Sequence, residues 1–393
     1  MRPEDKRRLS IVNLLKGSKR PAVYMLQEAL EKVGVHAGGI DGNFGPGCDK
    51  GVRAFQSAAG LREDGEVGKG TWSVLLRQAY QKGFKPGLPR RCQELISWFE
   101  VDGYQNTYGQ AEPDIGDGAG ANYGLLQHNR HGSLVHVLKL GGRSDLALLY
   151  KGTKDKSQVI PEIKEWMGSR SGRDAQNAYF MKVVWRLAAR QLKTLPEIAG
   201  WENNPFLHRY YERAMMMMCD TVTQNGTFWS SKRKPFWKSL TAEEAQVAKY
   251  RELYEGEGWD ELLGQWVPYT ELKVVWFRHE KDQEGNRAKA NVAACNELLS
   301  RVPDAEKKLV MLAQWRARTS WEKYWRAVAA RRMLDATGHG RVNGATISLS
   351  RDYGIGVDSA DVEDRDGGSM ESFVKDAGAD ILQDLDLDGT RAA

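Results

Sequence analysis

Hydrophobic positions near the start of the chain recur at helical spacing in three short stretches. The marker residues are Val23, Leu26, Leu30 and Val33 in the first stretch, Val52 and Phe55 in the second, and Trp72, Leu75 and Leu76 in the third. Glycine-rich turns at 38–45 and 64–65 separate the stretches. Because helices this short are marginal by themselves, we expect the three to share one core. The pattern predicts a small three-helix domain over residues 1–80.

The longer remainder of the chain is also mainly helical in pattern. Helices are predicted over 92–100, 174–193, 205–222, 242–255 and 304–336. The last of these is predicted as one long helix that ends at Gly338. Residues 104–127 are rich in Gly, Tyr and Asn and predict a short, irregular β-hairpin region. We find no internal repeat, and the predicted fold class is mainly α.

Residues 81–91 separate the two parts of the chain. This segment contains two prolines and two glycines, which interrupt helices. We therefore expect a linker over 81–91. A second domain is expected over 92–356, followed by an acidic C-terminal extension over 357–393.

Charge is unevenly distributed along the 393 residues. The chain has 57 Lys and Arg against 52 Asp and Glu, a formal net charge of +5. Residues 356–393 contain 11 acidic and 3 basic residues, so the preceding 355 residues carry about +13. A cationic body favours a polyanionic partner such as nucleic acid, a membrane surface or a cell wall. No nucleic-acid-binding motif accompanies the charge, so we expect no nucleic-acid partner.

Neither the cysteines nor the hydrophobic runs indicate an exported or membrane-spanning chain. Four cysteines lie far apart and form no CxxC pair, so reduced thiols are expected. The apolar stretch 11–15 is too short for the core of a signal peptide. No run of about 18 apolar residues predicts a transmembrane helix. We expect a chain that is made in the cytoplasm and inserts stably into no membrane.

The first domain carries a dense series of motifs. In order they are Val23-x-x-Leu-Gln27, Asp41-Gly-x-Phe-Gly45, Val52-x-x-Phe-Gln56, Asp64-Gly-x-Val-Gly68 and Thr71-Trp72. Over about 50 residues this series resembles the three-helix peptidoglycan-binding domain found on many wall hydrolases. The resemblance implies bacterial peptidoglycan as the partner. Cys48 departs from the usual Thr of that family, which implies a weaker cap on the following helix.

Apolar and glycine residues of this domain are expected to serve its scaffold, since Asp-Gly turns require a positive φ that glycine supplies. Contact with the wall is expected from polar and aromatic groups around the turns. These candidate wall-binding residues are Asp41, Asn43, Phe44 and Arg53.

Two acidic residues of the second domain stand in contrasting surroundings. Glu100 ends an apolar helix, where partial burial favours the protonated form that a general acid needs. Asp117 lies between glycines in a turn and is expected to be solvated and ionised. Two carboxyl groups in unlike environments are the basis of glycoside hydrolysis.

A Glu at a helix end followed by Ile115-Gly-Asp117-Gly resembles the chitosanases of glycoside hydrolase family 46. The segment 123–127, Tyr-Gly-Leu-Leu-Gln, resembles goose-type lysozymes and lytic transglycosylases. The resemblance covers about 35 residues and implies a lysozyme-like fold for 92–356. It also implies Glu100 as general acid and Asp117 as general base of an inverting reaction. The chitosanases carry a water-holding Thr after the Asp-Gly turn, and the nearest residue here is Asn122.

Other polar residues of this region are expected to contact saccharide. They are Glu112, Asp114, Asn122, Tyr123 and Gln127. Glu112, Asp114 and Asp102 are also rivals for the role of second carboxylate. His128, His131 and His136 lie close in sequence but lack acidic or cysteine partners at a known metal spacing. We therefore expect no metal and no cofactor.

These features predict a modular peptidoglycan hydrolase, in which the first domain binds the wall and the second cuts the glycan. The cationic body and the order of the domains resemble a bacteriophage endolysin. Such an enzyme is made in the host cytoplasm without a signal peptide and acts at the cell wall or periplasm. We also expect this protein to be a monomer. Three alternatives stay open: a lytic transglycosylase that uses Glu100 alone, a chitosanase, and a non-catalytic wall-binding or virion structural protein.

Overall fold

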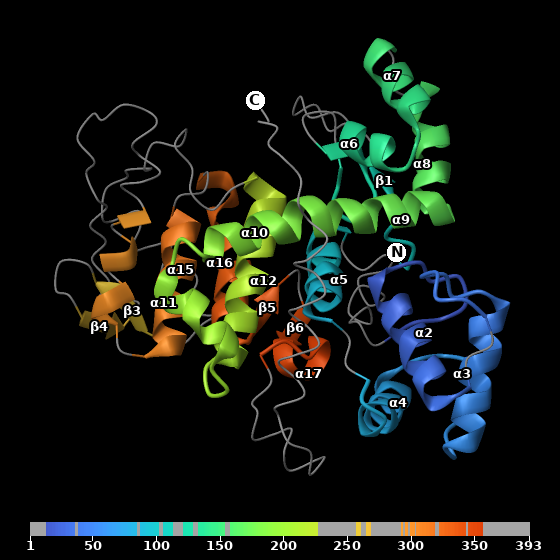
Figure 1. Ribbon diagram of the computed structural model, residues 1–393, viewed down its shortest axis with the longest axis horizontal. Coiled ribbons are helices and arrows are strands. Elements are labelled where there is room, and N and C mark those ends of the chain that lie inside the picture. Colours follow the sequence, from blue (N-terminus) through green and yellow to red (C-terminus); the bar gives the residue numbers. More distant parts are fainter. Residues whose placement is uncertain are drawn as a thin grey trace.

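The structure is a computed structural model of the chain. It describes residues 13–35, 38–84, 87–101, 105–112, 121–128, 133–153, 158–226, 257–260, 265–268, 292–293, 295–297, 299–302, 304–318, 322–342 and 345–356. Helices make up most of this part of the chain, accompanied by short two-stranded ladders (Figure 1). The prediction of a mainly α fold with a short hairpin region is confirmed.

Three helices form the N-terminal domain, as the hydrophobic spacing predicted. They are α2 (Pro21–Val33), α3 (Pro46–Ala58) and α4 (Lys69–Gln81). Proline begins both α2 and α3, where its missing N–H would have had no helical partner. The most buried of the marker residues are Val23, Leu26, Leu30, Val52, Phe55 and Leu75. They lie in one shared core.

Two turns of this domain are closed in the same way, which reveals an internal repeat that the sequence analysis missed. Gln27 accepts hydrogen bonds from both backbone amides of the first turn (Asp41–Gly42), at 2.9 and 2.8 Å, and donates to its carboxylate. Gln56 accepts a bond from the glycine of the second turn (Asp64–Gly65) and donates to its carboxylate, both at 2.9 Å. The glutamine precedes its aspartate by 14 residues in one case and by 8 in the other, so no fixed period marks the repeat.

The larger part of the chain is a helical body. Its described helices are α5 (Leu88–Val101), α6 (Ser133–Leu140), α7 (Ser144–Gly152), α8 (Ile160–Gly168), α9 (Arg170–Tyr179), the π-helix η2 (Phe180–Trp185), α10 (Arg186–Leu192), α11 (Pro196–Ala199), the 3₁₀-helix η3 (Gly200–Asn203), α12 (His208–Asn225), α15 (Ala305–Arg318), α16 (Glu322–Thr337) and α17 (Leu349–Tyr353). Its strands pair antiparallel: β1 (Ala111–Glu112) with β2 (Asn122–Tyr123), β3 (Glu257–Asp260) with β4 (Gln265–Pro268), and β5 (His339–Val342) with β6 (Ala345–Ser348).

The connection between the two parts is shorter than the predicted linker over 81–91. Helix α5 begins at Leu88, so Pro89 lies in its first turn. Proline is tolerated there because the first N–H groups of a helix have no intrahelical partner. Phe84 is 9% exposed and packs into the core that the two parts share.

The prediction of one helix over 304–336 is wrong. Helices α15 and α16 are separate and pack against each other over many residues (Figure 1). A single helix of this length would extend about 50 Å, whereas two paired helices contribute their buried residues to one core. The sequence between the two helices contains neither proline nor glycine, so no breaker residue marked the break.

The predicted helix over 174–193 is present and begins earlier, at Arg170. Helices α9, η2 and α10 follow one another without interruption and form one long rod across the molecule (Figure 1). The rod ends at Leu192, before Pro196, as predicted. The predicted helix over 205–222 corresponds to α12, and the one over 242–255 lies outside the described residues.

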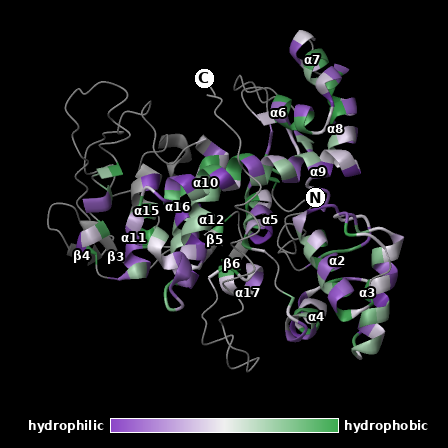
Figure 2. Cartoon of the chain, viewed as in Figure 1, coloured by the Kyte–Doolittle hydropathy of each residue, from purple (hydrophilic) through white to green (hydrophobic). Residues whose placement is uncertain are grey.

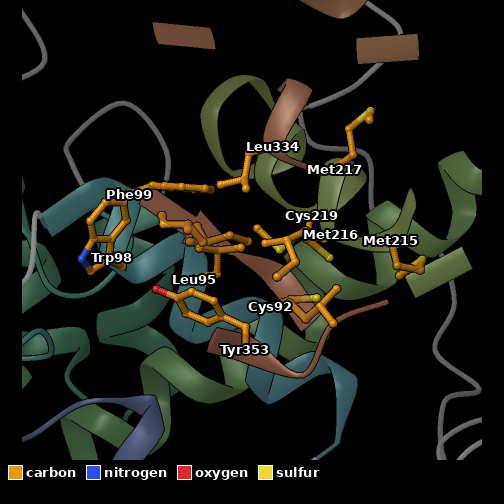
Figure 3. Packing of buried hydrophobic residues seen from close by; sticks show 14 of the residues in the cluster. Cys92, Leu95, Trp98, Phe99, Met215, Met216, Met217, Cys219, Leu334 and Tyr353 are labelled. Carbon is orange, nitrogen blue, oxygen red and sulfur yellow. The ribbon is translucent and has the colours of Figure 1, made fainter. Parts of the chain in front are cut away.

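Helix α5 lies inside the main core. Its buried side chains Cys92, Leu95, Trp98 and Phe99 lie among residues of α12, α16 and α17 (Figure 3). Helix α12 contributes four consecutive methionines, 215–218, each with no exposed surface. Most helices carry both hydrophobic and hydrophilic residues, as amphipathic elements do (Figure 2). A smaller second core lies under α6, α7 and α8.

The cysteines are buried and free, in agreement with the expected thiols. Within the described residues, no helix is both long enough and apolar enough to cross a membrane.

Replacing Gly42 by Ala is expected to destabilise the N-terminal domain more than the same change at Gly60. Both glycines have a positive φ, +69° and +65°, so a side chain costs about 1–2 kcal/mol at either site. A Cβ at Gly42 would also lie 2.0 Å from Cε2 of Tyr24, whereas Gly60 faces open space. Urea unfolding followed by tryptophan fluorescence measures both losses. Equal losses would contradict the packing described here.

Candidate active site

Glu100 lies at the C-terminal end of α5. Its side chain is 14% exposed, and Oε1 accepts a hydrogen bond from Nη2 of Arg331 at 2.7 Å. Arg331 belongs to α16, 231 residues further along the chain. Its guanidinium also lies over the ring of Phe99, 4.4 Å from the ring centre. The carboxyl group is therefore partly buried, as expected, but it faces a cation as well as apolar side chains.

Behind Glu100 lies a network of buried charges. Asp220 of α12 accepts a bond from Nε of Arg331 at 3.1 Å and forms ion pairs with Nη2 of the same residue and with Nη1 of Arg332. Arg332 also donates to Gln224 at 2.9 Å and to Asp335 at 3.3 Å. Asp220, Arg332 and Asp335 have no exposed surface. The network joins α12 and α16 beneath the end of α5.

The two buried aspartates of the network titrate in opposite directions. Burial opposes ionisation of Asp220, but the charges of Arg331 and Arg332 outweigh it and lower the pKa of this carboxyl. Burial raises the pKa of Asp335 well above its usual range, and the charge of Asp220 adds to the effect. The carboxylate of Asp220 is therefore shared by the guanidinium groups of Arg331 and Arg332.

Sequence reasoning missed Arg331, Arg332 and Asp220. A signal for them was present, since Asp220 follows a run of methionines and the two arginines lie between the apolar residues Val328-Ala-Ala330 and Met333-Leu334. Charged residues are almost never fully buried without a partner. Residues of opposite charge within apolar stretches therefore indicate ion pairs in the core. Because they are far apart in the sequence, the sequence does not show which residues pair.

Gln127 connects the β1–β2 hairpin to the end of α5. Its amide Nε2 donates to the backbone carbonyl of Glu100 at 2.6 Å and to Oε2 of Glu112 at 3.0 Å. The backbone of Gln127 has a φ of +49°, a left-handed conformation that residues other than glycine adopt only at a cost in free energy. Asn122 lies opposite Glu112 in the hairpin. Four predicted residues, Glu100, Glu112, Asn122 and Gln127, thus lie in one region.

Tyr123, another predicted saccharide contact, does not join this group. Tyr123 is completely buried, with its ring edge-on to Tyr150, and burial raises its pKa. Its side chain is a core element, so the expectation of a saccharide contact is wrong for Tyr123. Asp114, Asp117 and the rival Asp102 lie outside the described residues.

Of the histidines after the hairpin, His128 is buried and His136 is exposed on α6. His128 has no exposed surface, its ring lies edge-on to Tyr179, and burial with the nearby His136 lowers its pKa to about 3. His131 lies outside the described residues. The part of the chain that the structure describes contains no group of three or more His, Cys, Asp or Glu side chains arranged to hold a metal ion.

The candidate wall-binding residues of the N-terminal domain are mostly engaged within the protein. Phe44 is completely buried, so its side chain belongs to the core and the expectation of wall contact is wrong. Asp41 faces the body, where its carbonyl accepts a bond from Nε of Arg173 at 3.0 Å. Asn43 is half-buried beside it. Arg53 is 41% exposed, and its guanidinium donates to the carbonyls of Glu63 and Asp64, bracing the second turn.

Comparison with known proteins bears on this domain. The family model of a peptidoglycan binding domain matches residues 19–75. The match supports an N-terminal peptidoglycan-binding domain. The match begins just before α2, includes α3 and ends within α4. The peptidoglycan-binding domain supports association of the protein with the cell wall, with peptidoglycan as its partner. Comparison with curated proteins gives no significant match for the chain.

Replacing Asp220 by Asn is expected to destabilise the body by about 3–5 kcal/mol, because two buried guanidinium groups lose their shared carboxylate. The matched control is Glu297→Gln, which removes the same charge from the exposed ion pair with Arg301 and should cost less than about 1 kcal/mol. Urea unfolding at pH 7 measures both changes. Similar small losses for the two variants would contradict the network.

Replacing Asp335 by Asn is expected to leave stability at pH 7 unchanged or higher. The folded carboxyl has a raised pKa and stays protonated, whereas the unfolded one ionises near its ordinary value of about 3.9. The wild type therefore loses stability relative to Asp335→Asn as the pH rises above about 4. Urea unfolding of both proteins at pH 4 and pH 7 measures this difference. A large loss in the variant at pH 7 would show that Asp335 is ionised.

Proposed function

We propose that the protein is a peptidoglycan hydrolase that cuts the glycan strand of the bacterial cell wall. The N-terminal domain holds the enzyme on its insoluble substrate, and the helical body carries the chemistry. A binding domain raises the local concentration of a catalytic domain at its substrate. In this respect the protein is similar to the lytic enzymes of bacteriophages, and we propose the cell wall or periplasm as its place of action.

One observation carries the catalytic part of the proposal. Glu100 lies at a partly exposed helix end, and its carboxylate is oriented by Arg331, which is itself anchored on Asp220. Buried charge networks are weak contributors to stability, because the cost of desolvating the charges can exceed their attraction. Residues whose pKa is shifted by burial and charged neighbours, such as Asp220 and Asp335, are concentrated at functional sites. The network therefore favours a role for Glu100 in chemistry over a role in stability alone.

In the proposed mechanism Glu100 protonates the glycosidic oxygen as the bond to the leaving sugar breaks. Arg331 engages Oε1, so Oε2 is the oxygen that meets the substrate. Asp117 activates the attacking water on the opposite face. For inversion the two carboxyl groups stand about 6.5–9.5 Å apart, and for retention about 5–5.5 Å.

The hairpin is the proposed wall of the glycan site. Glu112 and Asn122 lie opposite each other in it, and Gln127 fixes it against the end of α5. Their carboxylate and amide groups can accept and donate hydrogen bonds to sugar hydroxyls. Asp114 belongs to the same proposed set through its place in the sequence.

Replacing Glu100 by Gln is expected to lower the rate of peptidoglycan cleavage by about 10²–10⁴-fold, because the amide cannot donate a proton to the leaving oxygen. The measurement is digestion of purified peptidoglycan, with mass spectrometry of the soluble fragments. Glu297→Gln is the control for loss of an exposed carboxylate and should cleave like the wild type.

The masses of the fragments separate the alternatives. Reducing ends with an added water indicate a hydrolase and identify the bond that is cut. Anhydro ends would indicate a lytic transglycosylase that needs Glu100 alone. Cleavage of a glucosamine polymer in preference to peptidoglycan would indicate a chitosanase. If the wild type releases nothing from either polymer, the protein is a non-catalytic wall-binding or structural protein.

A further inference from the structure

A buried ion pair joins the peptidoglycan-binding domain to the helix that carries Glu100. Arg20, just before α2, and Glu94, in the middle of α5, both have no exposed surface. Nε of Arg20 donates to Oε1 of Glu94 at 2.6 Å. The other carboxylate oxygen accepts a bond from the backbone N–H of Ala22 at 2.8 Å. Glu94 therefore caps the first turn of a helix in the other domain, a task that usually falls to a residue next to that helix.

A second contact joins the same domain to the segment that follows α5. The backbone N–H of Lys19 donates to the carbonyl of Gln105 at 2.8 Å, and the N–H of Thr107 donates to the carbonyl of Lys19 at 2.9 Å. The side-chain amide of Gln105 donates to the carbonyl of Asn13 at 3.0 Å. This segment leads directly into strand β1 with Glu112. Both the helix and the hairpin of the proposed site are therefore attached to the peptidoglycan-binding domain.

A third contact closes the first turn against α9. Arg173 donates to the carbonyl of Asp41, and the hydroxyl of Tyr24 lies 3.4 Å from Oδ1 of Asp174. The guanidinium of Arg90, in α5, lies 4.3 Å from the centre of the Tyr24 ring. The peptidoglycan-binding domain lies beside α5 and α9 (Figure 1). One hydrophobic cluster runs through both parts without a gap.

These contacts differ from those of a binder on a flexible linker. We infer that the peptidoglycan-binding domain is a fixed part of the catalytic body, and that Arg20 and Glu94 are positioning residues for Glu100. The inference rests on the proposed function for its catalytic consequence. Glu94 and Glu100 are six residues apart on one helix, about 9 Å along its axis. A displacement of α5 at Glu94 therefore reaches the carboxyl group of Glu100.

The consequence is that wall binding fixes the orientation of the glycan site as well as its local concentration. A tethered domain lets the catalytic part rotate over the wall. A domain joined through a buried ion pair presents the site at one angle and depth. Each glycan strand bound by the domain then has a set position relative to Glu100.

The test compares Glu94→Gln with Asp64→Asn in the full-length protein. The first change leaves Arg20 buried without its carboxylate, and the second alters the second turn of the same domain, away from α5. For Glu94→Gln we expect amide hydrogen exchange over 88–101 to become at least tenfold faster. We also expect kcat on a short soluble peptidoglycan glycan to fall at least tenfold, with KM and binding to intact sacculi within threefold of the wild type. Asp64→Asn should change neither the exchange nor kcat.

The outcomes separate this inference from the proposed function. If the wild type cleaves no glycan, the proposed function fails, and exchange over 88–101 still decides whether Glu94 holds α5. Unchanged exchange in a folded Glu94→Gln protein, or equal acceleration in Asp64→Asn, would overturn the inference. If Glu94→Gln does not fold, the double variant Arg20→Met with Glu94→Gln removes the unpaired buried cation. It should fold and still show the faster exchange.

Discussion

Helix α5 is held by buried or nearly buried ion pairs along its length, and the arrangement of the rest of the molecule follows from them. Arg91 pairs with Glu212 of α12 at 2.8 Å, Glu94 with Arg20 before α2, and Glu100 with Arg331 of α16. Each pair joins α5 to a different element. Hydrophobic packing alone is nondirectional, so it would permit several rotations of a short helix in this core. Three charged pairs of fixed geometry allow only one rotation of α5.

The core around α5 shows why such fixed points are needed. Its neighbour α12 buries four methionines and Cys219, which are flexible or small and adapt to many packings. In Figure 3, Met216 and Cys219 lie on the side of Leu95 and Cys92 of α5. In the same helix Asp220 is completely buried between two arginines. The adaptable side chains fill the volume, and the charges set the register between α12 and α16.

The peptidoglycan-binding domain divides its two equivalent turns between two tasks. The first turn faces the body and contacts Arg173, while the second is braced by Arg53 and carries exposed Glu63 and Glu66. Of the residues expected to bind the wall, those of the first turn are largely occupied inside the protein. The first turn therefore attaches the domain to the rest of the chain, and the second lies on the surface.

Local sequence was sufficient for the elements with strong short-range signals. Helical spacing located α2, α3 and α4, and motif order identified the peptidoglycan-binding domain that the family comparison then matched. The end of the α9–α10 rod before Pro196 was also predictable, because proline in the interior of a helix removes a backbone hydrogen bond. Glu100 could be placed near a helix end because the apolar positions at helical spacing stop there.

Tertiary structure decided everything that depends on which distant residues meet. The sequence pattern could not distinguish one long helix from the α15–α16 pair. The segment rich in proline and glycine predicted a linker, so the buried contact between Arg20 and Glu94 was not expected. Tyr123 and Phe44 have the composition of binding residues, but the folded chain surrounds both. The sequence determined the helices, the wall-binding domain and a candidate acid. Only the fold brought Arg331 to Glu100 and Arg20 to Glu94, because a buried charge is stable only beside a partner that chain topology delivers.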